Sequence, residues 1–337
     1  MSSSGSKLFT LAMLCFIIFL CPLFSTQVSA AVASPLKVGF YKESCPSAEK
    51  IVRKSVEKAM SRDPTIAAGI IRMYFHDCFV KGCEASVLLD SPTAEKTSRA
   101  NNGSLRGLEV IGEAKAQIEA QCPATVSCAD IIAFAARDSA YTAGGIYYAV
   151  PAGRRDGLNS SADDVFPNLP GPDHNVTILA EKFANKGMSI DEMVTLSGAH
   201  AIGVSHCPTF AKRLYNFNTT HAQDPSLNPD YAELLKIRCP PKAMPTTTVP
   251  LSILAPKNRL DNKYYAGVRN GLGLFTSDQT LMDTSLTSKM VADNEKDGAS
   301  WARKFAKAMV HLGSLDVLTG EQGEIRTICS KVNGHNN

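Results

Sequence analysis

Residues 70–90 read IIRMYFHDCFVKGCEASVLLD and combine strongly apolar side chains with several chemically active ones. Arg72 and His76 are four residues apart, so a helix places them on one face. An always-charged guanidinium beside an imidazole, on a helix that is otherwise apolar, needs a reason. One interpretation is a packed histidine with a surface arginine. The other is acid–base chemistry on a small polar substrate, in which the imidazole moves a proton and the guanidinium stabilises negative charge.

The second half of this stretch is rich in oxygen ligands. Asp77, Glu84 and Ser86 alternate with small residues, and Cys78 and Cys83 are close enough in sequence to form a staple. Hard oxygens in a short loop suit Ca²⁺, with backbone carbonyls completing the coordination shell. The spacing is not that of an EF-hand, so from the residues alone calcium is one interpretation among others.

A second histidine lies far along the chain. His200 belongs to the segment LSGAHAIG at residues 196–203, whose small residues let a flat, bulky group approach closely. A lone histidine in such a place is usually a core residue satisfied by its neighbours. Two distant histidines, one beside an arginine and one among small residues, would also fit the two faces of a haem.

Outside these segments, helical periodicity dominates and predicts a mainly α fold with few short strands. Residues 150–174 are rich in turns. Proline- and glycine-rich stretches at 151–172 and 240–256 either separate lobes or form surface excursions within one fold. The helices that we expect cover residues 47–60, 65–79, 105–121, 128–143, 176–185, 189–197 and 300–312.

Composition and the N-terminus indicate a secreted protein. The chain has 337 residues, of which 20% are charged, and its net charge of +3 is too weak to suggest nucleic-acid binding. Residues 1–30 carry one charge, Lys7, followed by an apolar run over 8–24 and then small residues. This order predicts a cleaved signal peptide at residues 1–30 rather than a membrane anchor, which leaves a domain over 31–337 and no membrane attachment.

The remaining cysteines and the sequons agree with secretion. Two of the ten cysteines lie in the signal segment, and an even number in the secreted part implies disulfides, although their pairing cannot be decided at this point. The chain ends eight residues after Cys329, without a long extension of the kind associated with vacuolar sorting, so we expect the apoplast or cell wall. Glycosylation acceptors are present at Asn102, Asn159, Asn175 and Asn218.

Taken together, the segments resemble the secretory plant peroxidases, the class III haem peroxidases. RMYFHDC at 72–78 is similar to the distal signature of that family and LSGAH at 196–200 to the proximal one, and the resemblance extends from Val38 to Arg326. It implies the haem-peroxidase fold, in which a distal lobe of about residues 36–150 and a proximal lobe of about 151–330 sandwich one haem b. It also implies reduction of H₂O₂ to water with one-electron oxidation of small phenolic donors, in wall lignification, cross-linking or the response to oxidative stress. We expect a monomer that also contacts cell-wall polymers.

The resemblance implies a role for each matching residue. His76 is the expected distal acid–base, Arg72 stabilises charge on the peroxide oxygen, and Asn101 orients His76. His200 is the expected axial ligand of the iron, and Asp278 accepts its other N–H. Phe75 belongs to the cofactor-binding set and Pro170 to the rim where donors dock. The implied disulfides are Cys45–Cys122, Cys78–Cys83, Cys128–Cys329 and Cys207–Cys239.

The resemblance implies two calcium sites, and this sequence matches only the distal one well. The distal site transfers, with Glu84 where aspartate is commoner. At the proximal site Ala201 replaces a threonine, and Ser252 and Ala255 replace an aspartate and a threonine, which leaves Asp261 as the one anionic remnant. Because affinity follows ligand charge, we predict that the proximal site is weak or absent. The distal ligands implied are Asp77, Val80, Gly82, Glu84 and Ser86, with Val80 and Gly82 acting through their carbonyls.

Further departures concern the core and the haem surroundings. Tyr148 stands where the family usually has its tryptophan, and Trp301 where phenylalanine is usual. Thr65 and Gly69 replace an arginine and a serine near the haem propionates. An alternative is therefore a secreted protein of this fold with a mainly wall-binding or structural role, and a third is a disulfide-rich binding module without cofactor. The complete set of catalytic residues favours the enzyme.

Overall fold

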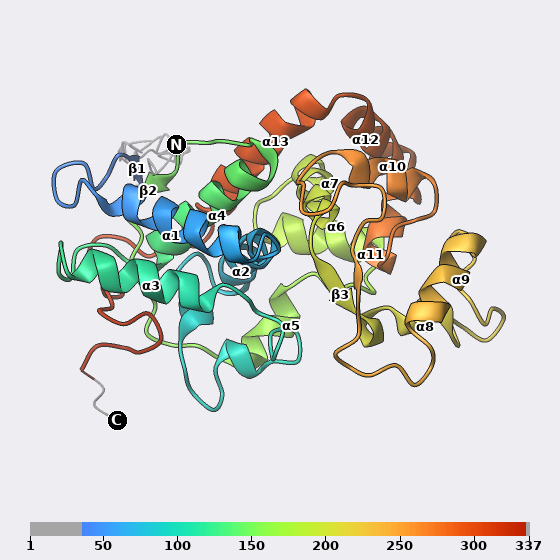
Figure 1. Ribbon diagram of the computed structural model, residues 1–337, viewed down its shortest axis with the longest axis horizontal. Helices are drawn as coiled ribbons and strands as arrows, with labels where there is room; N and C mark the ends of the chain where they lie inside the picture. The colour runs from blue at the N-terminus through green and yellow to red at the C-terminus, as the bar shows by residue number, and fades with distance from the viewer. Residues whose placement is uncertain (1–35, 335–337) are drawn as a thin grey trace, which may run out of the picture. The chain divides into compact units, whose positions relative to one another are not determined.

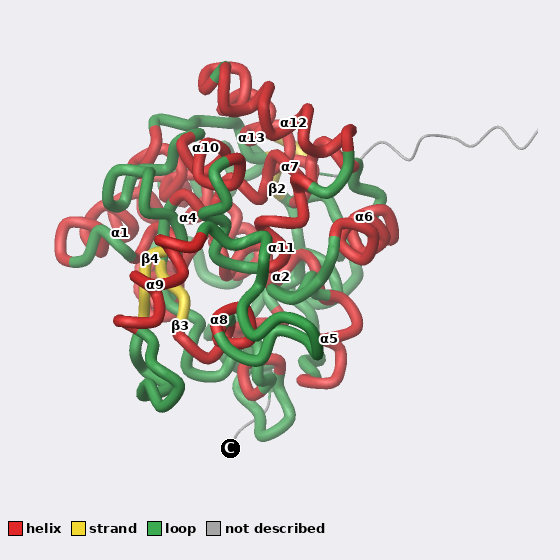
Figure 2. The backbone as a smooth tube through the Cα atoms, turned by 90° about the vertical axis from the view of Figure 1, so that its right-hand side faces the viewer, coloured by secondary structure: helices red, strands yellow, loops and turns green. Residues whose placement is uncertain are grey.

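The computed structural model describes residues 36–334, and within this range the fold is mainly helical, as predicted (Figures 1 and 2). The strands of this range form two small antiparallel sheets. Strand β1 (Lys37–Val38) pairs with β2 (Pro151–Ala152), and β3 (Val204–His206) pairs with β4 (Thr248–Pro250). The predicted signal peptide lies outside the described residues. None of the described helices is long and apolar enough to cross a membrane.

The helices of the described residues are α1 (Ala48–Arg62), α2 (Ile66–Val80), α3 (Leu108–Glu119), α4 (Cys128–Gly144), α5 (Val165–Asn168), α6 (Val176–Asn185), α7 (Ile190–Ser197), α8 (Ala211–Leu214), α9 (Pro229–Arg238), α10 (Lys263–Arg269), α11 (Thr276–Gln279), α12 (Ser285–Lys296) and α13 (Gly298–Leu312). Short 3₁₀ turns join them, including η1 (Ser86–Leu88) after α2 and η4 (Gly198–Ala201) after α7.

Every helix predicted from periodicity is present, with ends that differ by at most three residues. The local signals explain several of these ends. Ser127 caps α4 by accepting from Asp130 N, and Gly145 ends it with φ +69°. Helix α7 begins with a capping box between Ser189 and Glu192.

Helices α9, α10 and α12 were not predicted, and neither were the short helices α5, α8 and α11. Helix α12 shows why, because it buries only Thr287, Val291 and Asn294 and so lacks an apolar stripe. It forms because Thr284 caps its first turn and because its neighbours α7, α10 and α13 cover it.

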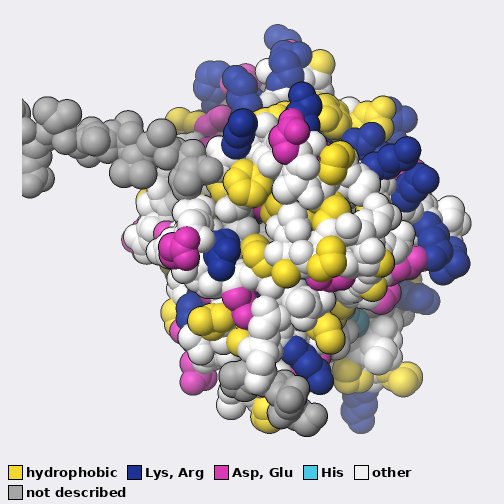
Figure 3. Space-filling model, turned by 90° about the vertical axis from the view of Figure 1, so that its left-hand side faces the viewer, with side chains coloured by type: hydrophobic (Ala, Val, Ile, Leu, Met, Phe, Trp, Pro, Cys, Tyr) yellow, Lys and Arg dark blue, Asp and Glu magenta, His cyan; other side chains and the backbone are white. Residues whose placement is uncertain are grey.

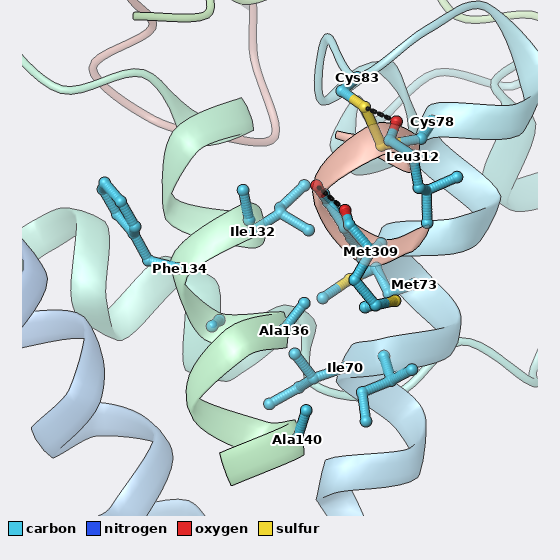
Figure 4. Packing of buried hydrophobic residues seen from close by; sticks show 14 of the residues in the cluster. Ile70, Met73, Cys78, Cys83, Ile132, Phe134, Ala136, Ala140, Met309 and Leu312 are labelled. Carbon is cyan, nitrogen blue, oxygen red and sulfur yellow. Dashed lines mark hydrogen bonds between the residues drawn. A yellow bond between two sulfur atoms is a disulfide. The ribbon is translucent and has the colours of Figure 1, made fainter. Parts of the chain in front are cut away.

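The main core lies where α2, α4 and α13 meet (Figure 4). Ile70 of α2 lies beside Ala136 and Ala140 of α4 (Figure 4). Met73 of α2, with Met309 and Leu312 of α13, continues the cluster. Helix α13 also contacts α7. It therefore links the N-terminal helices to the group α7, α10 and α12, although it lies near the end of the chain (Figure 1).

Four disulfides are present in the structure, and they are the pairs implied by the resemblance: Cys45–Cys122, Cys78–Cys83, Cys128–Cys329 and Cys207–Cys239. The Cys128–Cys329 bond joins residues 201 positions apart and ties the segment after α13 to the first residue of α4. A bridge between Asp156 and Glu324 holds the same segment nearby. The C-terminal segment therefore belongs spatially to the N-terminal half.

One buried ion pair supports this arrangement. Arg154 and Asp130 are both at most 1% exposed, and Arg154 Nη1 lies 2.6 Å from Asp130 Oδ1. Asp130 also accepts from Tyr41 Oη at 2.7 Å, and Arg154 Nε donates to the carbonyl of Gly313 at 2.8 Å. The pair therefore connects the turn after β1, helix α4 and the end of α13 in one hydrogen-bonded group. On the face shown in Figure 3, basic and acidic side chains are mixed, in agreement with the small net charge.

Candidate active site

Helix α2 carries one open stripe on an otherwise buried surface. Its buried residues include Ile70, Met73 and Tyr74, which pack into the core. The stripe, by contrast, is half-exposed and follows helical spacing; it consists of Ala68, Gly69, Arg72, Phe75 and His76. The predicted pair of Arg72 and His76 therefore shares one open face of the helix.

The orientation of His76 follows from its hydrogen bonds. Its Nδ1 lies 2.6 Å from Asn101 Oδ1, and Asn101 Nδ2 donates to the carbonyl of Glu95 at 2.9 Å. Because that carbonyl can only accept, the amide must turn its oxygen toward the imidazole. His76 therefore carries its proton on Nδ1, and its Nε2 lone pair is free among the described residues to accept another.

Arg72 is fixed by the loop on both sides of Asn101. Its guanidinium donates to the carbonyls of Ala100 at 2.8 Å and Ser104 at 3.1 Å. Burial lowers the pKa of Arg72 to about 10, which leaves it charged at neutral pH. Burial, and then the Arg72 charge, hold the pKa of His76 well below its usual 6.5, so the imidazole is neutral and can act as a base.

His200 lies in η4, directly after α7, and is oriented by a buried carboxylate. Its Nδ1 donates to Asp278 Oδ1 at 2.7 Å, and Asp278 is 1% exposed. Tyr264 Oη donates to the same oxygen at 2.9 Å, and Phe275 N to the other at 2.8 Å. The ring of Phe275 packs edge-on against His200 with centroids 5.5 Å apart. The imidazole is thus locked, with Nε2 as its remaining nitrogen.

The segment of His200 approaches the open stripe of α2. Gly203 has φ +98°, and a Cβ there would lie 3.1 Å from Ala68 Cβ, a residue of the stripe. The His200 side chain remains 35% exposed, although its neighbours Leu196 and Ala201 are buried. Two oriented imidazoles with free Nε2 atoms, one beside a cation and one beside a carboxylate, fit the distal and axial positions of a haem.

The surroundings of the stripe differ from the family pattern as the sequence indicates. Gly69 leaves space that is filled by Arg106, whose Cβ lies 2.8 Å from where a Cβ of Gly69 would be. Arg106 Nη2 donates to Thr65 Oγ1 at 2.9 Å and pairs with Asp63. A second cation therefore stands at this end of α2.

Phe75 and Pro170 lie at different places around the site. Phe75 stacks on Phe79 with ring centroids 4.5 Å apart, whereas its centroid lies 6.5 Å from that of His76. Pro170 is half-buried, and two residues later the carbonyl of Pro172 accepts from Ser277 N of α11, next to Asp278. A cavity of about 250 Å³ lies here, lined by residues that include Pro172 and Phe275.

The predicted calcium loop gathers acidic side chains in the interior. Asp77 is completely buried and accepts from Ala85 N at 2.9 Å. Glu84 is 7% exposed, and Ser86 Oγ is buried without a hydrogen-bond partner among the described residues. The carbonyl of Val80 accepts from Lys186 Nζ at 3.2 Å and that of Gly82 from Glu84 N at 2.7 Å.

Glu95 belongs to this cluster and was missed in the sequence. It is completely buried, and neither carboxylate oxygen has a hydrogen-bond partner within residues 36–334. Burial raises the pKa of Glu95 to about 7, and burial together with Glu95 raises that of Asp77 well above its usual range. Carboxyl groups that are buried without hydrogen-bond partners must be neutralised by a bound cation or by protonation. In this range no three His, Cys, Asp or Glu side chains converge on one point, so a cation would take hydroxyl and carbonyl ligands as well, as Ca²⁺ does.

At the predicted proximal calcium position the donors are few. Asp261 is half-exposed and uses Oδ1 to accept from Lys263 N at 2.9 Å. Ser252 Oγ accepts from Ala255 N at 3.3 Å, and Ala201 is buried without a side-chain oxygen. These contacts supply one carboxylate, already engaged in a local turn.

The remaining functional residue that sequence reasoning missed is Tyr264, which shares Asp278 with His200. Neither Glu95 nor Tyr264 carries a local signal. The burial of Glu95 results from tertiary packing, and Tyr264 is defined by its contact with Asp278, which in turn holds His200. Tyr264 lies in α10, a helix that periodicity did not reveal.

The chain is similar to known proteins over most of its length. A family model described as peroxidase matches residues 52–297. Peroxidase 5 of Vitis vinifera is 50% identical over 334 residues, which cover 98% of this chain and 99% of the relative. Peroxidase 1 of Zea mays is 45% identical, covering 90% and 85%, and Peroxidase 25 of Arabidopsis thaliana is 44% identical, covering 88% and 92%.

A mainly helical fold that holds two oriented histidines in this way is that of a peroxidase, an H₂O₂-dependent oxidoreductase. The chain belongs to the plant class III peroxidases, which oxidise donors with H₂O₂. Members of this family carry haem b and calcium and are typically secreted. The predicted family, fold class and enzyme class are thereby confirmed.

Proposed function

We propose that this peroxidase works outside the cell, where it oxidises small phenolic donors in wall lignification, cross-linking or oxidative stress. Its four glycosylation acceptors are exposed, and its four disulfides suit an oxidising compartment. We further propose that it is a monomer able to contact wall polymers, and that residues 36–150 and 151–330 form the distal and proximal lobes.

One observation carries the assignment of roles. The contacts of Asn101 to Glu95 and to His76 fix the imidazole tautomer, so that its basic nitrogen lies on the open stripe of α2. When bound, haem supplies an iron that reduces peroxide and then oxidises donors one electron at a time. His200 Nε2 would hold that iron, and Asp278 strengthens its basicity by accepting the Nδ1 proton. Phe75 would contact the cofactor.

The chain's own groups handle protons and charge. His76 Nε2 accepts a proton from the oxygen of H₂O₂ near it and returns that proton to the departing oxygen, which leaves as water. The Arg72 guanidinium stabilises the negative charge that develops while the oxygen–oxygen bond breaks. Each phenol then gives up one electron and one proton, and Pro170 at the loop beside α11 would form part of the surface where it docks.

Calcium is proposed at one of the two family positions. Asp77, Glu84, Ser86 and the carbonyls of Val80 and Gly82 would hold Ca²⁺, and Glu95 lies close enough to compensate its charge. At the second position, Asp261 alone supplies a side-chain charge, so we propose weak or no binding there. Metal analysis that found two tightly held Ca²⁺ ions per chain would contradict this part.

An absorption spectrum tests the function. The haem-loaded protein should show a Soret band that shifts on adding one equivalent of H₂O₂, and His76→Leu should retain the band but respond far more slowly. His221→Leu, on an exposed loop, serves as the matched control and should respond like the parent. A band indifferent to peroxide, or unchanged kinetics in His76→Leu, would refute the assignment.

A further inference from the structure

An uninterrupted row of aromatic rings leads away from His200. The ring of Tyr264 lies 6.2 Å from that of His200, Tyr265 lies 5.1 Å from Tyr264, and Trp301 lies 6.2 Å from Tyr265, all between centroids and all edge-on. The two tyrosines belong to α10 and the tryptophan to α13. These helices pack with α7 and α12 (Figure 1), and α10 and α7 both contact the η4 turn.

Two contacts join this row closely to the His200 segment. Tyr264 Oη and His200 Nδ1 share the same oxygen, Asp278 Oδ1, at 2.9 and 2.7 Å. Gly198, two residues before His200, meets the far end of the row. A Cβ at Gly198 would lie 2.7 Å from Tyr265 Oη and 2.8 Å from Trp301 Nε1, so the absence of a side chain lets both groups approach the backbone.

The two ends of the row differ in where a proton can go. The Tyr264 phenol faces a carboxylate, which can accept its proton when the ring is oxidised. Tyr265 Oη and Trp301 Nε1 face the carbonyl of Thr195, at 3.0 and 3.1 Å, and a carbonyl does not take up a proton at neutral pH. An indole can lose an electron and keep its proton, whereas a phenol loses both together. Trp301 is therefore the residue in this row that suits a resting oxidised state.

We propose that Trp301 stores one oxidising equivalent when reducing donors are scarce; this rests on the proposed role of His200 as the iron ligand. After H₂O₂ has removed two electrons from the haem-loaded site, Tyr264 gives one electron back through His200, and its proton moves to Asp278 Oδ1. Trp301 then reduces Tyr264 through the Tyr265 ring, and Tyr264 recovers its proton. Trp301 has lost one electron and no atom, and the site has gained one electron.

Trp301 is the last readily oxidised ring of the row. The next ring, Phe305 at 5.4 Å, is not readily oxidised, and Trp301 is 2% exposed. A large donor in solution cannot touch the indole. The oxidised Trp301 therefore acts as an internal store that draws the oxidising equivalent away from the haem, and not as a second surface for substrates.

The chain's single tryptophan makes the test specific, because deuterating the indole ring labels one residue. Haem-loaded protein is mixed with one equivalent of H₂O₂ without donor, frozen, and studied by electron paramagnetic resonance. We expect an organic radical whose hyperfine splitting narrows in the indole-deuterated protein and whose signal is lost in Trp301→Phe. Tyr148→Phe removes a buried tyrosine outside the row and should leave the signal unchanged.

The outcomes separate this inference from the function on which it rests. An absorption spectrum that changes with peroxide, together with a radical that deuteration does not alter or that persists in Trp301→Phe, overturns the inference alone. A spectrum indifferent to peroxide contradicts the proposed function and the inference together. Because the labelled protein has the parent sequence, the test does not depend on how well the variant folds.

Discussion

Removing the Asn101 side chain should weaken His76 as a base in a particular way. In the parent, Asn101 Oδ1 accepts the Nδ1 proton at 2.6 Å and raises the pKa of His76, against burial and the Arg72 charge, which lower it. In Asn101→Ala both tautomers of the neutral ring become accessible, and the positively charged ring that forms during reaction loses its acceptor. Peroxide reduction should therefore slow at every pH, and its acid limb should move to lower pH.

The size of the effect follows from the contact. A hydrogen bond to a charged group contributes about 1.5–3 kcal/mol and one to a neutral group about 1 kcal/mol. The difference, about 1 kcal/mol, corresponds to a fall of a little under one unit in the pKa of His76. Loss of the tautomer preference adds to this, so we expect the plateau rate to fall by about ten- to a hundredfold, less than on removing a catalytic base altogether.

Stopped-flow measurements of the Soret change against pH provide the assay. Asn102→Ala is the matched control, since Asn102 is the adjacent residue, is exposed, and makes no side-chain contact with His76. General damage to the site would lower the plateau without moving the acid limb to lower pH. An acid limb that moved to higher pH, or a plateau equal to that of the parent, would refute the orientation that we derive for Asn101.

Three further predictions concern stability and cofactor retention. Chelating calcium should lower the melting temperature. The chelated protein should lose a further ~3 kcal/mol of unfolding free energy between pH 4.5, where the unfolded chain releases the Glu95 proton, and pH about 7, where the folded chain releases it. Melts of chelated protein whose stability does not fall between pH ~4.5 and ~7 would contradict this. Arg154→Met should lower the free energy of unfolding, measured with denaturant, by about 3–5 kcal/mol, because it leaves the Asp130 charge buried without its partner. Adding Asp130→Asn removes that charge and should recover part of the loss. Equal losses in the single and the double variant would argue against the buried charge as the cause. Gly198→Ala places a Cβ 2.7 Å from Tyr265 Oη. It should lower the free energy of unfolding by about 1–3 kcal/mol and weaken haem binding in titrations. Gly112→Ala in α3, where a Cβ meets no atom within 4 Å, is the control and should have neither effect.

A structural feature could be predicted from the sequence where it depends on residues that are close together in the chain. It could not be predicted where it depends on tertiary packing. Helix α2 and its pair Arg72 and His76 could be predicted, because apolar periodicity and a four-residue spacing are local. Helix α6 was predicted with its observed ends, Val176–Asn185, because Asn175 caps it and its apolar face is continuous. Helix α12 was missed since its burial comes from neighbouring helices rather than from its own apolar residues.

The site shows the same limit more sharply. Spacing alone could not connect His200 with Asp278, which are 78 residues apart, and the pair entered through the resemblance to a family. Glu95 was beyond both routes, because nothing in its neighbourhood in sequence indicates a carboxylate that will be completely buried. Its burial results from packing against a loop whose acids are also enclosed, a property of the folded chain only.

The buried acids and His76 are connected by the backbone in two ways. Asp77 follows His76 directly on α2, and the Glu95 carbonyl holds Asn101, which holds His76. From the other side, Arg326 donates to the carbonyls of Glu84 at 3.1 Å and Ala85 at 2.7 Å, while Cys329 is bonded to Cys128. A shift in the calcium loop would therefore move both supports of His76 together. The C-terminal segment, although far from His76 in sequence, thus helps to hold the proposed distal base, and loss of calcium should affect the peroxide reaction before the fold itself is lost.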